Sequence, residues 1–157
     1  MYTFDMLLSD DILIRIAICV LGGFGFLVAS HIYKHKRAKK PLVCPVGFDC
    51  NFVVHSDYSE FMHIPLEIFG MAYYALLSIF YFVSIFIFDI MPIQLESILL
   101  LASLGAFVFS MYLLGVQIFV LKKGCSWCIV SAFVSILIFI LTALHYDFNL
   151  VGQIFSK

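Results

Sequence analysis

The chain has 157 residues, which suits a single domain, and it is 64% hydrophobic but only 12% charged. Soluble domains carry roughly 25% charged residues, and the mean hydropathy here is +1.10, so the composition excludes an ordinary soluble globule. The net charge is −1, and the sequence has neither a nucleic-acid motif nor a glycine-rich phosphate loop, so we expect no nucleic-acid partner.

The first long apolar segment runs from about residue 12 to residue 33. Crossing a bilayer takes ~20 apolar residues, so this segment is long enough. Arg15 lies near its start, where a long side chain can extend to the membrane surface. The residues before it include Asp5, Asp10 and Asp11 rather than a basic region, and no small-residue cleavage site follows. We therefore expect a permanent membrane anchor, not a cleaved signal peptide.

The next segment, residues 34–65, is a loop that contains Cys44 and Cys50. A proline and a glycine between the two cysteines favour a turn, so their sulfur atoms can approach within bonding distance. Farther along, Asp57–Glu60 has the spacing of a helix capping box with Asp at its head. This spacing predicts a short helix that opens there and lies on the membrane surface.

Three further apolar segments lack charged residues, at about 68–88, 97–121 and 125–146. Inside a bilayer every backbone polar group must be paired within the protein, so all four apolar segments are predicted to be helices. Membrane helices approach closely where small residues line the contact. On that basis we expect helix contacts at Gly22, Gly23, Gly25, Gly105, Gly115, Ser131 and Ser135.

The predicted fold is an all-α integral membrane bundle of four transmembrane helices. A cysteine-bearing loop and a short surface helix separate the first two, and residues 1–157 form one domain. Because the number of spans is even, both termini lie on one side, while the loop 34–65 and the turn 122–124 share the other. Counting helices therefore predicts that Cys44, Cys50, Cys125 and Cys128 meet at one face of the membrane.

Cys125 and Cys128 form a Cys-x-x-Cys motif at the start of the fourth span. Free backbone N–H groups and the helix dipole stabilise a thiolate at such a position, which lowers the pKa of the thiol and makes it reactive. Cys128 lies one turn deeper, at the edge of the hydrocarbon, where a lipid-soluble electron acceptor can reach it. Two cysteine pairs on the same side can pass electrons by thiol–disulfide exchange.

Other interpretations of the four cysteines remain open. With His55 or His63 they could form a tetrahedral metal site, although the spacing between the loop cysteines is long for zinc ligands. Two purely structural disulfides, in a membrane assembly factor without enzymatic activity, are a further alternative. The two histidines are also consistent with ordinary solvated or hydrogen-bonded loop residues.

Several single residues also have two interpretations. Glu67 near the start of the second span either complements the helix dipole or takes part in proton transfer. Trp127 is either an interfacial anchor or part of a groove for a partner. Cys19, in the middle of the first span, is expected to be a packing residue. The aromatic rings of Phe69, Phe107, Phe109 and Phe133 are either ordinary core or lipid-facing residues or stacking partners for a ligand.

The loop sequence CNFVVHSDYSEFMHIPLEIFGMAYY (residues 50–74) together with CSWCIVS (residues 125–131) resembles the vitamin K epoxide reductase family, especially its short bacterial and archaeal disulfide-forming members. His63 departs from the family, which usually has Gly at this position. The matching residues, in the family order, are Cys44, Cys50, Ser56, Tyr58, Ser59, Ile64, Pro65, Gly70, Cys125 and Cys128.

The resemblance implies a membrane thiol oxidoreductase that supports protein disulfide formation. Cys44 would take electrons from a thioredoxin-fold partner, Cys50 would exchange with Cys125, and Cys128 would face the quinone. Ser56 would correspond to the loop Ser/Thr beside the family's active-site pair, although a turn or capping role is equally open. The electron acceptor would be a quinone of the ubiquinone or menaquinone type. Because no thioredoxin-like domain follows the fourth span, we expect the DsbA-like partner to be a separate protein.

The orientation in a plasma (inner) membrane is predicted from two arguments that disagree. Seven of the nine Lys and Arg residues lie on the cysteine side, which the positive-inside rule assigns to the cytosol. Disulfides persist on the outer face, where most of the resembled family works. We expect the extracytoplasmic orientation because oxidising chemistry is needed most widely there.

Overall fold

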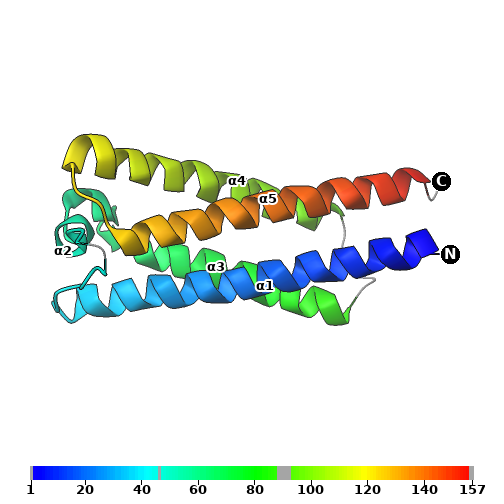
Figure 1. Ribbon diagram of the computed structural model, residues 1–157, viewed down its shortest axis with the longest axis horizontal. Helices are drawn as coiled ribbons and strands as arrows, with labels where there is room; N and C mark the ends of the chain where they lie inside the picture. Colours follow the sequence, from blue (N-terminus) through cyan, green and yellow to red (C-terminus); the bar gives the residue numbers. More distant parts are fainter. Residues whose placement is uncertain (1, 46, 88–92, 156–157) are drawn as a thin grey trace.

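The computed structural model describes residues 2–45, 47–87 and 93–155, with side chains within 10–45, 47–87 and 94–147. Four long helices form an elongated bundle (Figure 1). They are α1 (Tyr2–Arg37), α3 (Leu66–Phe86), α4 (Ile93–Gly115) and α5 (Ser126–Phe155), and a π-helical segment, η2 (Val116–Leu121), continues α4. The short elements after α1 are α2 (Cys50–Val54), the 3-10 helix η1 (Asp57–Ser59), and the strands β1 (Glu60–Phe61) and β2 (Ile64–Pro65).

The four long helices have the length and composition of membrane spans. Even the shortest, α3, has 21 residues, and at ~1.5 Å per residue it crosses a hydrocarbon core of ~30 Å. The segments apolar enough to cross a membrane are Asp10–Arg37, Leu66–Phe86, Gln94–Leu121 and Ser126–Asp147. The predicted all-α membrane bundle with four spans is confirmed.

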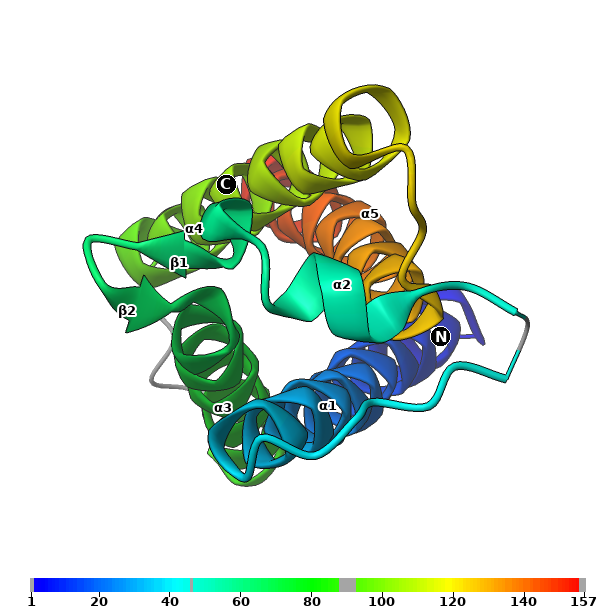
Figure 2. The same ribbon diagram turned by 90° about the vertical axis from the view of Figure 1, so that its left-hand side faces the viewer.

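The arrangement of the helices separates the molecule into two ends. The N- and C-terminal ends of the chain lie together at one end of the bundle, and α2 lies at the other (Figure 1). Viewed from that end, α2 lies across the tops of the helices, beside the β1–β2 hairpin (Figure 2). We call this the cysteine end, because the loop with Cys44 and Cys50 and the start of α5 both lie there.

One tyrosine of α3, Tyr74, lies in the close contact with α1 and reaches α5 through its hydroxyl group. A Cβ added at Gly25 would lie 2.6 Å from the Tyr74 ring, and one at Gly22 would lie 3.2 Å from its carbonyl oxygen. The Tyr74 hydroxyl lies 2.8 Å from the Ser135 Oγ and donates to the Ser131 carbonyl oxygen at 2.8 Å. The predicted contacts at these four positions are therefore confirmed.

Three other glycines predicted to lie at helix contacts do not. A Cβ added at Gly23, Gly105 or Gly115 would meet nothing within 4 Å. Gly105 faces the cavity described below instead of a neighbouring helix. The sequence pattern of small residues thus identifies contact sites in α1 and α5, but it was wrong for Gly23 in α1 and for both glycines of α4.

Arg15 does not extend to the membrane surface as predicted. Only 5% of it is exposed, and it forms a 2.9 Å ion pair with Asp11 and a 3.2 Å hydrogen bond to the carbonyl oxygen of Ser84. Asp11 also lies 2.9 Å from the Nε2 of His145. Arg15 is buried because Asp11 on α1 and the Ser84 carbonyl on α3 satisfy it inside the bundle, while His145 on α5 contacts Asp11.

The predicted capping box at Asp57–Glu60 does not form. A 3-10 helix of one turn, η1, opens at Asp57 and ends at Ser59 without a side-chain cap, and Glu60 already belongs to β1. The short surface helix is α2 instead, and the Asp49 carboxylate caps it by accepting from the backbone N–H of Phe52 at 3.3 Å. The turn between β1 and β2 places Met62 and His63 at φ of 52° and 66°. Both values lie in the left-handed region, which Gly adopts most readily, as expected for a two-residue hairpin.

Candidate functional site

The outer cysteine pair is formed by the loop and by the first residue of α2. Cys44 and Cys50 form a disulfide, with their Cα atoms 5.9 Å apart. Cys50 is buried, whereas Cys44 is half-buried and lies next to Val43, which is 79% exposed. The disulfide is therefore accessible from solvent mainly through Cys44.

The inner pair lies at the start of α5, as predicted. Cys125 is fully buried and immediately precedes the helix, while Cys128 lies in its first turn, and both are free thiols. The backbone N–H of Cys128 donates to the Cys125 sulfur at 3.4 Å. Hydrogen bonding from the Cys128 side chain lowers the pKa of the Cys125 thiol, and the backbone N–H groups of Cys128 and Trp127 add to this effect against the opposing effect of burial.

The two pairs meet at the end of the bundle. The sulfur atoms of Cys44, Cys50 and Cys125 all lie within 4.8 Å of one another. Sulfurs this close need only small movements to exchange a disulfide. Cys128 is not part of this group of three and lies on the side of Cys125 that faces the bundle interior, where it lines the cavity described below.

Sequence reasoning missed Ser126, which lies between the two pairs. Its hydroxyl donates to the Cys44 sulfur at 3.2 Å and lies 3.9 Å from the Cys50 sulfur. A donor at this place stabilises negative charge on whichever loop sulfur leaves as a thiolate. Its position inside the Cys-x-x-Cys motif was the only signal available in the sequence.

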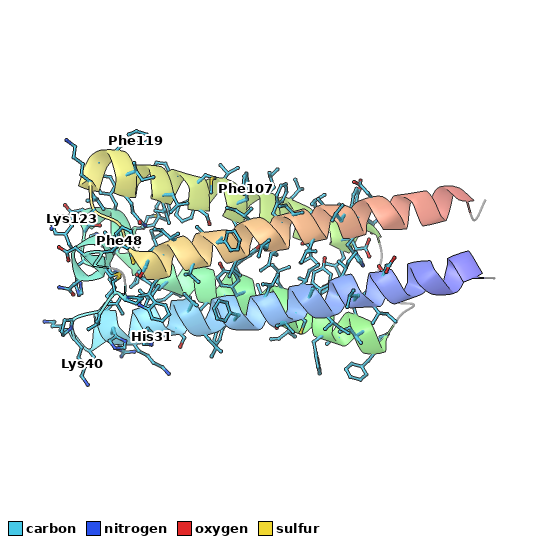
Figure 3. All side chains as sticks on the ribbon, viewed as in Figure 1. His31, Lys40, Phe48, Phe107, Phe119 and Lys123 are labelled. Atoms are coloured by element: carbon cyan, nitrogen blue, oxygen red, sulfur yellow. A yellow bond between two sulfur atoms is a disulfide. The ribbon has the colours of Figure 1, made fainter. Side chains whose placement is uncertain are left out.

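Contacts between the turn before α5 and the loop hold the two pairs together. The Lys123 ammonium forms a 2.6 Å ion pair with Asp49 and lies 4.9 Å from the centre of the Phe52 ring. The hydrogen bond from Lys123 lowers the pKa of the Asp49 carboxyl. The ring of Phe48 lies against Gly124, where an added Cβ would approach it to 2.8 Å. Figure 3 shows Phe48 and Lys123 at this end of the bundle.

Trp127 adds a further link between α5 and the loop. Its indole N–H donates to the carbonyl oxygen of Val43 at 3.3 Å, and its ring lies 4.8 Å from that of His31 on α1. Val43 directly precedes Cys44, so Trp127 fixes the backbone at the exposed cysteine.

A large apolar cavity lies between the four helices beneath α2. Its volume is about 520 Å³, which falls within the range of small-molecule sites. Cys128 is the only cysteine among the described residues that line it. Phe69 and Phe109 also face it, whereas Phe107 stacks on Phe139 and Phe133 is 60% exposed. Two of the four candidate stacking rings are therefore in position to contact a ligand.

The π-helical segment η2 brings a polar side chain to the cavity. Gln117 lines the cavity, and its side-chain oxygen accepts from the backbone N–H of Cys125 at 3.2 Å. The backbone carbonyl oxygen of Gln117 accepts from the backbone N–H of Lys123 at 3.2 Å. Such π-helical turns are frequent at functional sites because they re-aim side chains. Here the turn links the cavity wall to the inner cysteine pair.

Ser56, the remaining predicted site residue, lines the cavity. Its hydroxyl donates to the carbonyl oxygen of Val53 at 2.7 Å, which closes the end of α2. This contact is that of a turn serine, and a chemical role for Ser56 stays a prediction.

The alternative metal site is reduced to three sulfur atoms in this structure. Within the described side chains, the group with metal-ligand spacing consists of Cys44, Cys50 and Cys125, and it includes neither His55 nor His63. Two of these sulfurs are joined in a disulfide, which leaves Cys125 as the one free thiol of the group in this state.

Comparison with known proteins agrees with this geometry. The model of the vitamin K epoxide reductase family matches residues 14–143. The chain belongs to this family. A search of curated proteins finds no match. Membership makes the protein a membrane thiol–disulfide oxidoreductase, and the family in general uses quinones as electron acceptors.

Proposed function

We propose that this family member oxidises a thioredoxin-fold partner and passes the electrons through its two cysteine pairs to a quinone. The observation that carries this proposal is the placement of the sulfur atoms. Three of them lie within 4.8 Å of one another at the surface end, and Cys128 lines an apolar cavity of about 520 Å³ directly behind them. Electrons that pass from a partner in solvent to an acceptor in the membrane must reach the outer pair first and Cys128, beside the cavity, last.

The electron transfer begins at the exposed pair. A thiolate of the partner attacks the sulfur of Cys44, which breaks the Cys44–Cys50 disulfide and releases Cys50 as a thiolate. The partner's second thiolate then attacks its own mixed-disulfide sulfur and releases Cys44. The partner has lost two electrons, and the outer pair of this protein is now a dithiol. Ser126, which hydrogen-bonds the Cys44 sulfur, stabilises the charge that develops there.

The second exchange moves the electrons inward. Cys50 attacks the sulfur of Cys125 in an inner Cys125–Cys128 disulfide, which releases Cys128 as a thiolate. Cys44 then attacks Cys50, reforms the outer disulfide and releases Cys125. The exchange would leave the outer pair oxidised and the inner pair reduced, and the disulfide and the free thiols of the structure are consistent with that state.

The quinone would occupy the cavity next to Cys128. The cavity has the size and the apolar lining that a ring with a hydrocarbon tail requires. Phe69 and Phe109 would contact the ring, and Gln117 offers a side-chain amide. The quinone, of the ubiquinone or menaquinone type, takes up two electrons and two protons and leaves as a quinol.

The cysteine end is proposed to face the outside of the plasma membrane. Lys40 and Lys123 are among the basic residues of this end (Figure 3), and their charge is more typical of a cytosolic face. Stable disulfide formation favours the outer face. Alkaline phosphatase fused after Lys40 is expected to be active, and activity only of a C-terminal fusion would reverse the orientation.

The test uses purified, fully reduced protein in lipid nanodiscs with a short-chain ubiquinone. Wild-type protein is expected to form disulfides as the quinone is consumed, while the Cys128→Ala variant consumes none. The Cys44→Ala variant is expected to lose oxidation of a partner but to keep oxidation of its inner pair. Full quinone-linked turnover by Cys128→Ala would contradict the proposal.

The close approach of three sulfur atoms is also the one observation that favours metal binding. A metal-binding protein would retain stoichiometric zinc after purification under reducing conditions and would lose it with any single cysteine. Zinc retention without quinone reduction would establish that alternative.

A further inference from the structure

Glu67, in the first turn of α3, is an acid that faces the cavity. Its side chain is only 10% exposed. Among the described residues that line the cavity it is the only Asp or Glu. Within the described part of the chain its buried Oε2 atom makes no hydrogen bond, and the Lys36 ammonium lies 3.6 Å from it. A buried carboxyl with an unsatisfied oxygen is costly unless the group is protonated or used by a ligand, so this residue calls for a functional explanation.

A lysine connects Glu67 with the protein surface. The Lys36 ammonium, in the last turn of α1, lies 3.6 Å from the Oε2 of Glu67 and 3.7 Å from the Oε1 of Glu60. It also donates to the Ser59 hydroxyl at 2.9 Å. The side chain of Lys36 is 10% exposed, whereas that of Glu60 is 47% exposed. The three ionisable groups therefore run from the cavity wall to solvent at the cysteine end.

The proposed electron transfer requires a proton donor at this place. Reduction of a quinone to a quinol takes two electrons and two protons. When Cys125, whose pKa is lowered, reacts as a thiolate, the reduced inner pair supplies two electrons but only one thiol proton, from Cys128. A second proton must come from another group that faces the same cavity.

We propose that Glu67 gives this second proton to the quinone and that Lys36 and Glu60 restore it from solvent. The inference rests on the proposed function, because it assumes that the quinone is reduced in this cavity. Cys125 and Cys128 join in a disulfide, and their electron pair passes to the quinone. One proton comes from the Cys128 thiol and the other from the Glu67 carboxyl, which becomes a carboxylate. Lys36 then transfers a proton to this carboxylate and regains one through Glu60 from water.

A purely structural pair would have a different signature. An ion pair between α1 and α3 would stabilise the fold, and its loss would affect binding and turnover alike. A proton donor affects the chemical step and leaves quinone binding nearly unchanged. The two roles are therefore separable by kinetics.

The kinetic test follows oxidation of pre-reduced protein by a short-chain ubiquinone in a single turnover. Glu67→Gln keeps the shape but lacks the acid, so its rate at saturating quinone is expected to fall about 100-fold, a typical contribution of a general acid. The quinone concentration for half-saturation should change by less than about threefold, and Glu67→Asp should recover part of the rate. The control, Asp57→Asn, removes an exposed carboxylate from the same loop and should keep the wild-type rate.

A second measurement does not depend on turnover. Dicyclohexylcarbodiimide, an apolar reagent, modifies protonated carboxyl groups in apolar surroundings, and mass spectrometry locates the modified residue. Glu67 of the wild-type protein is expected to be modified, and the short-chain ubiquinone should protect it. This measurement decides the case even if Glu67→Gln does not fold.

The outcomes separate the two proposals. If the wild-type protein is not oxidised by the quinone, the proposed function fails. If the wild-type protein and Glu67→Gln are oxidised at equal rates, or if Glu67 remains unmodified by the reagent, only the assignment of Glu67 is overturned.

Discussion

The two ends of the bundle use buried polar groups in opposite ways. At the end with the termini, Asp11, Arg15 and His145 are paired with one another across α1 and α5. At the cysteine end, the free thiol of Cys128 and the carboxyl of Glu67 face a cavity of about 520 Å³. The paired residues at the end with the termini hold helices together, whereas Cys128 and Glu67 at the cysteine end are available to a ligand. In this molecule, buried charged residues that pair with one another join helices, whereas buried groups that line the cavity can contact a ligand.

The largest expected effect is a loss of stability when the ion pair at the end with the termini is removed. Asp11→Ala would leave Arg15 buried without its 2.9 Å ion pair. Loss of one partner of a buried ion pair costs about 3 kcal/mol, so the free energy of unfolding should fall by that amount. The rate of quinone reduction per folded molecule should not change. Chemical denaturation in mild detergent measures the first quantity, and a loss of rate in the folded fraction would show that the two ends are coupled.

A second prediction concerns the contact that joins α1, α3 and α5 between the ends. Gly25→Ala would place a Cβ 2.6 Å from the Tyr74 ring. Overpacking of this kind costs about 2 kcal/mol and displaces the hydroxyl of Tyr74 from its serine partners. Gly23→Ala is the matched control, because its Cβ would meet nothing within 4 Å. Equal unfolding free energies for the two variants would contradict the packing described here.

A third prediction concerns the pKa of the Cys125 thiol at the cysteine end. The pKa of Cys125 is lowered mainly by hydrogen bonding from Cys128. Because a lowered pKa keeps the thiolate populated at lower pH, its ultraviolet absorbance should persist below the usual thiol pKa of about 8.5. Cys128→Ala should move the titration upward. Subtracting the spectrum of Cys125→Ser isolates the signal, and an unchanged midpoint in Cys128→Ala would refute the stated cause.

The smallest effect is expected at the hairpin. His63 has a φ of 66°, a left-handed value that costs a non-glycine residue about 1 kcal/mol. His63→Gly should therefore raise the free energy of unfolding by roughly that amount, with no change in quinone reduction. A lower stability in the variant would mean that the histidine side chain makes a contribution that outweighs the backbone cost.

Much of the architecture follows from the sequence because long apolar segments admit few structures in a membrane. The even number of spans alone placed Cys44 and Cys125 at the same end. Local spacing was less reliable in the loop, where Asp49 rather than Asp57 caps a helix. Both residues have the side chain of a helix cap, and only tertiary contacts such as the ion pair of Asp49 with Lys123 select one of them.

The parts of the site that sequence reasoning missed are contacts between distant residues. The approach of Ser126 to Cys44 joins residues on two separate segments. The contact of Lys36 with Glu67 joins α1 to α3. Neither contact has a spacing along the chain that could reveal it, because each depends on how the helices pack.

The central claim, that electrons pass between Cys50 and Cys125, has a direct test. A variant with Cys19, Cys44 and Cys128 replaced by alanine retains only these two cysteines. Mild oxidation in nanodiscs, followed by digestion without reductant and mass spectrometry, is expected to yield a peptide pair linked by a Cys50–Cys125 disulfide within one chain. If both thiols remain free in the folded variant under conditions that oxidise the wild-type pairs, the proposed electron transfer is contradicted.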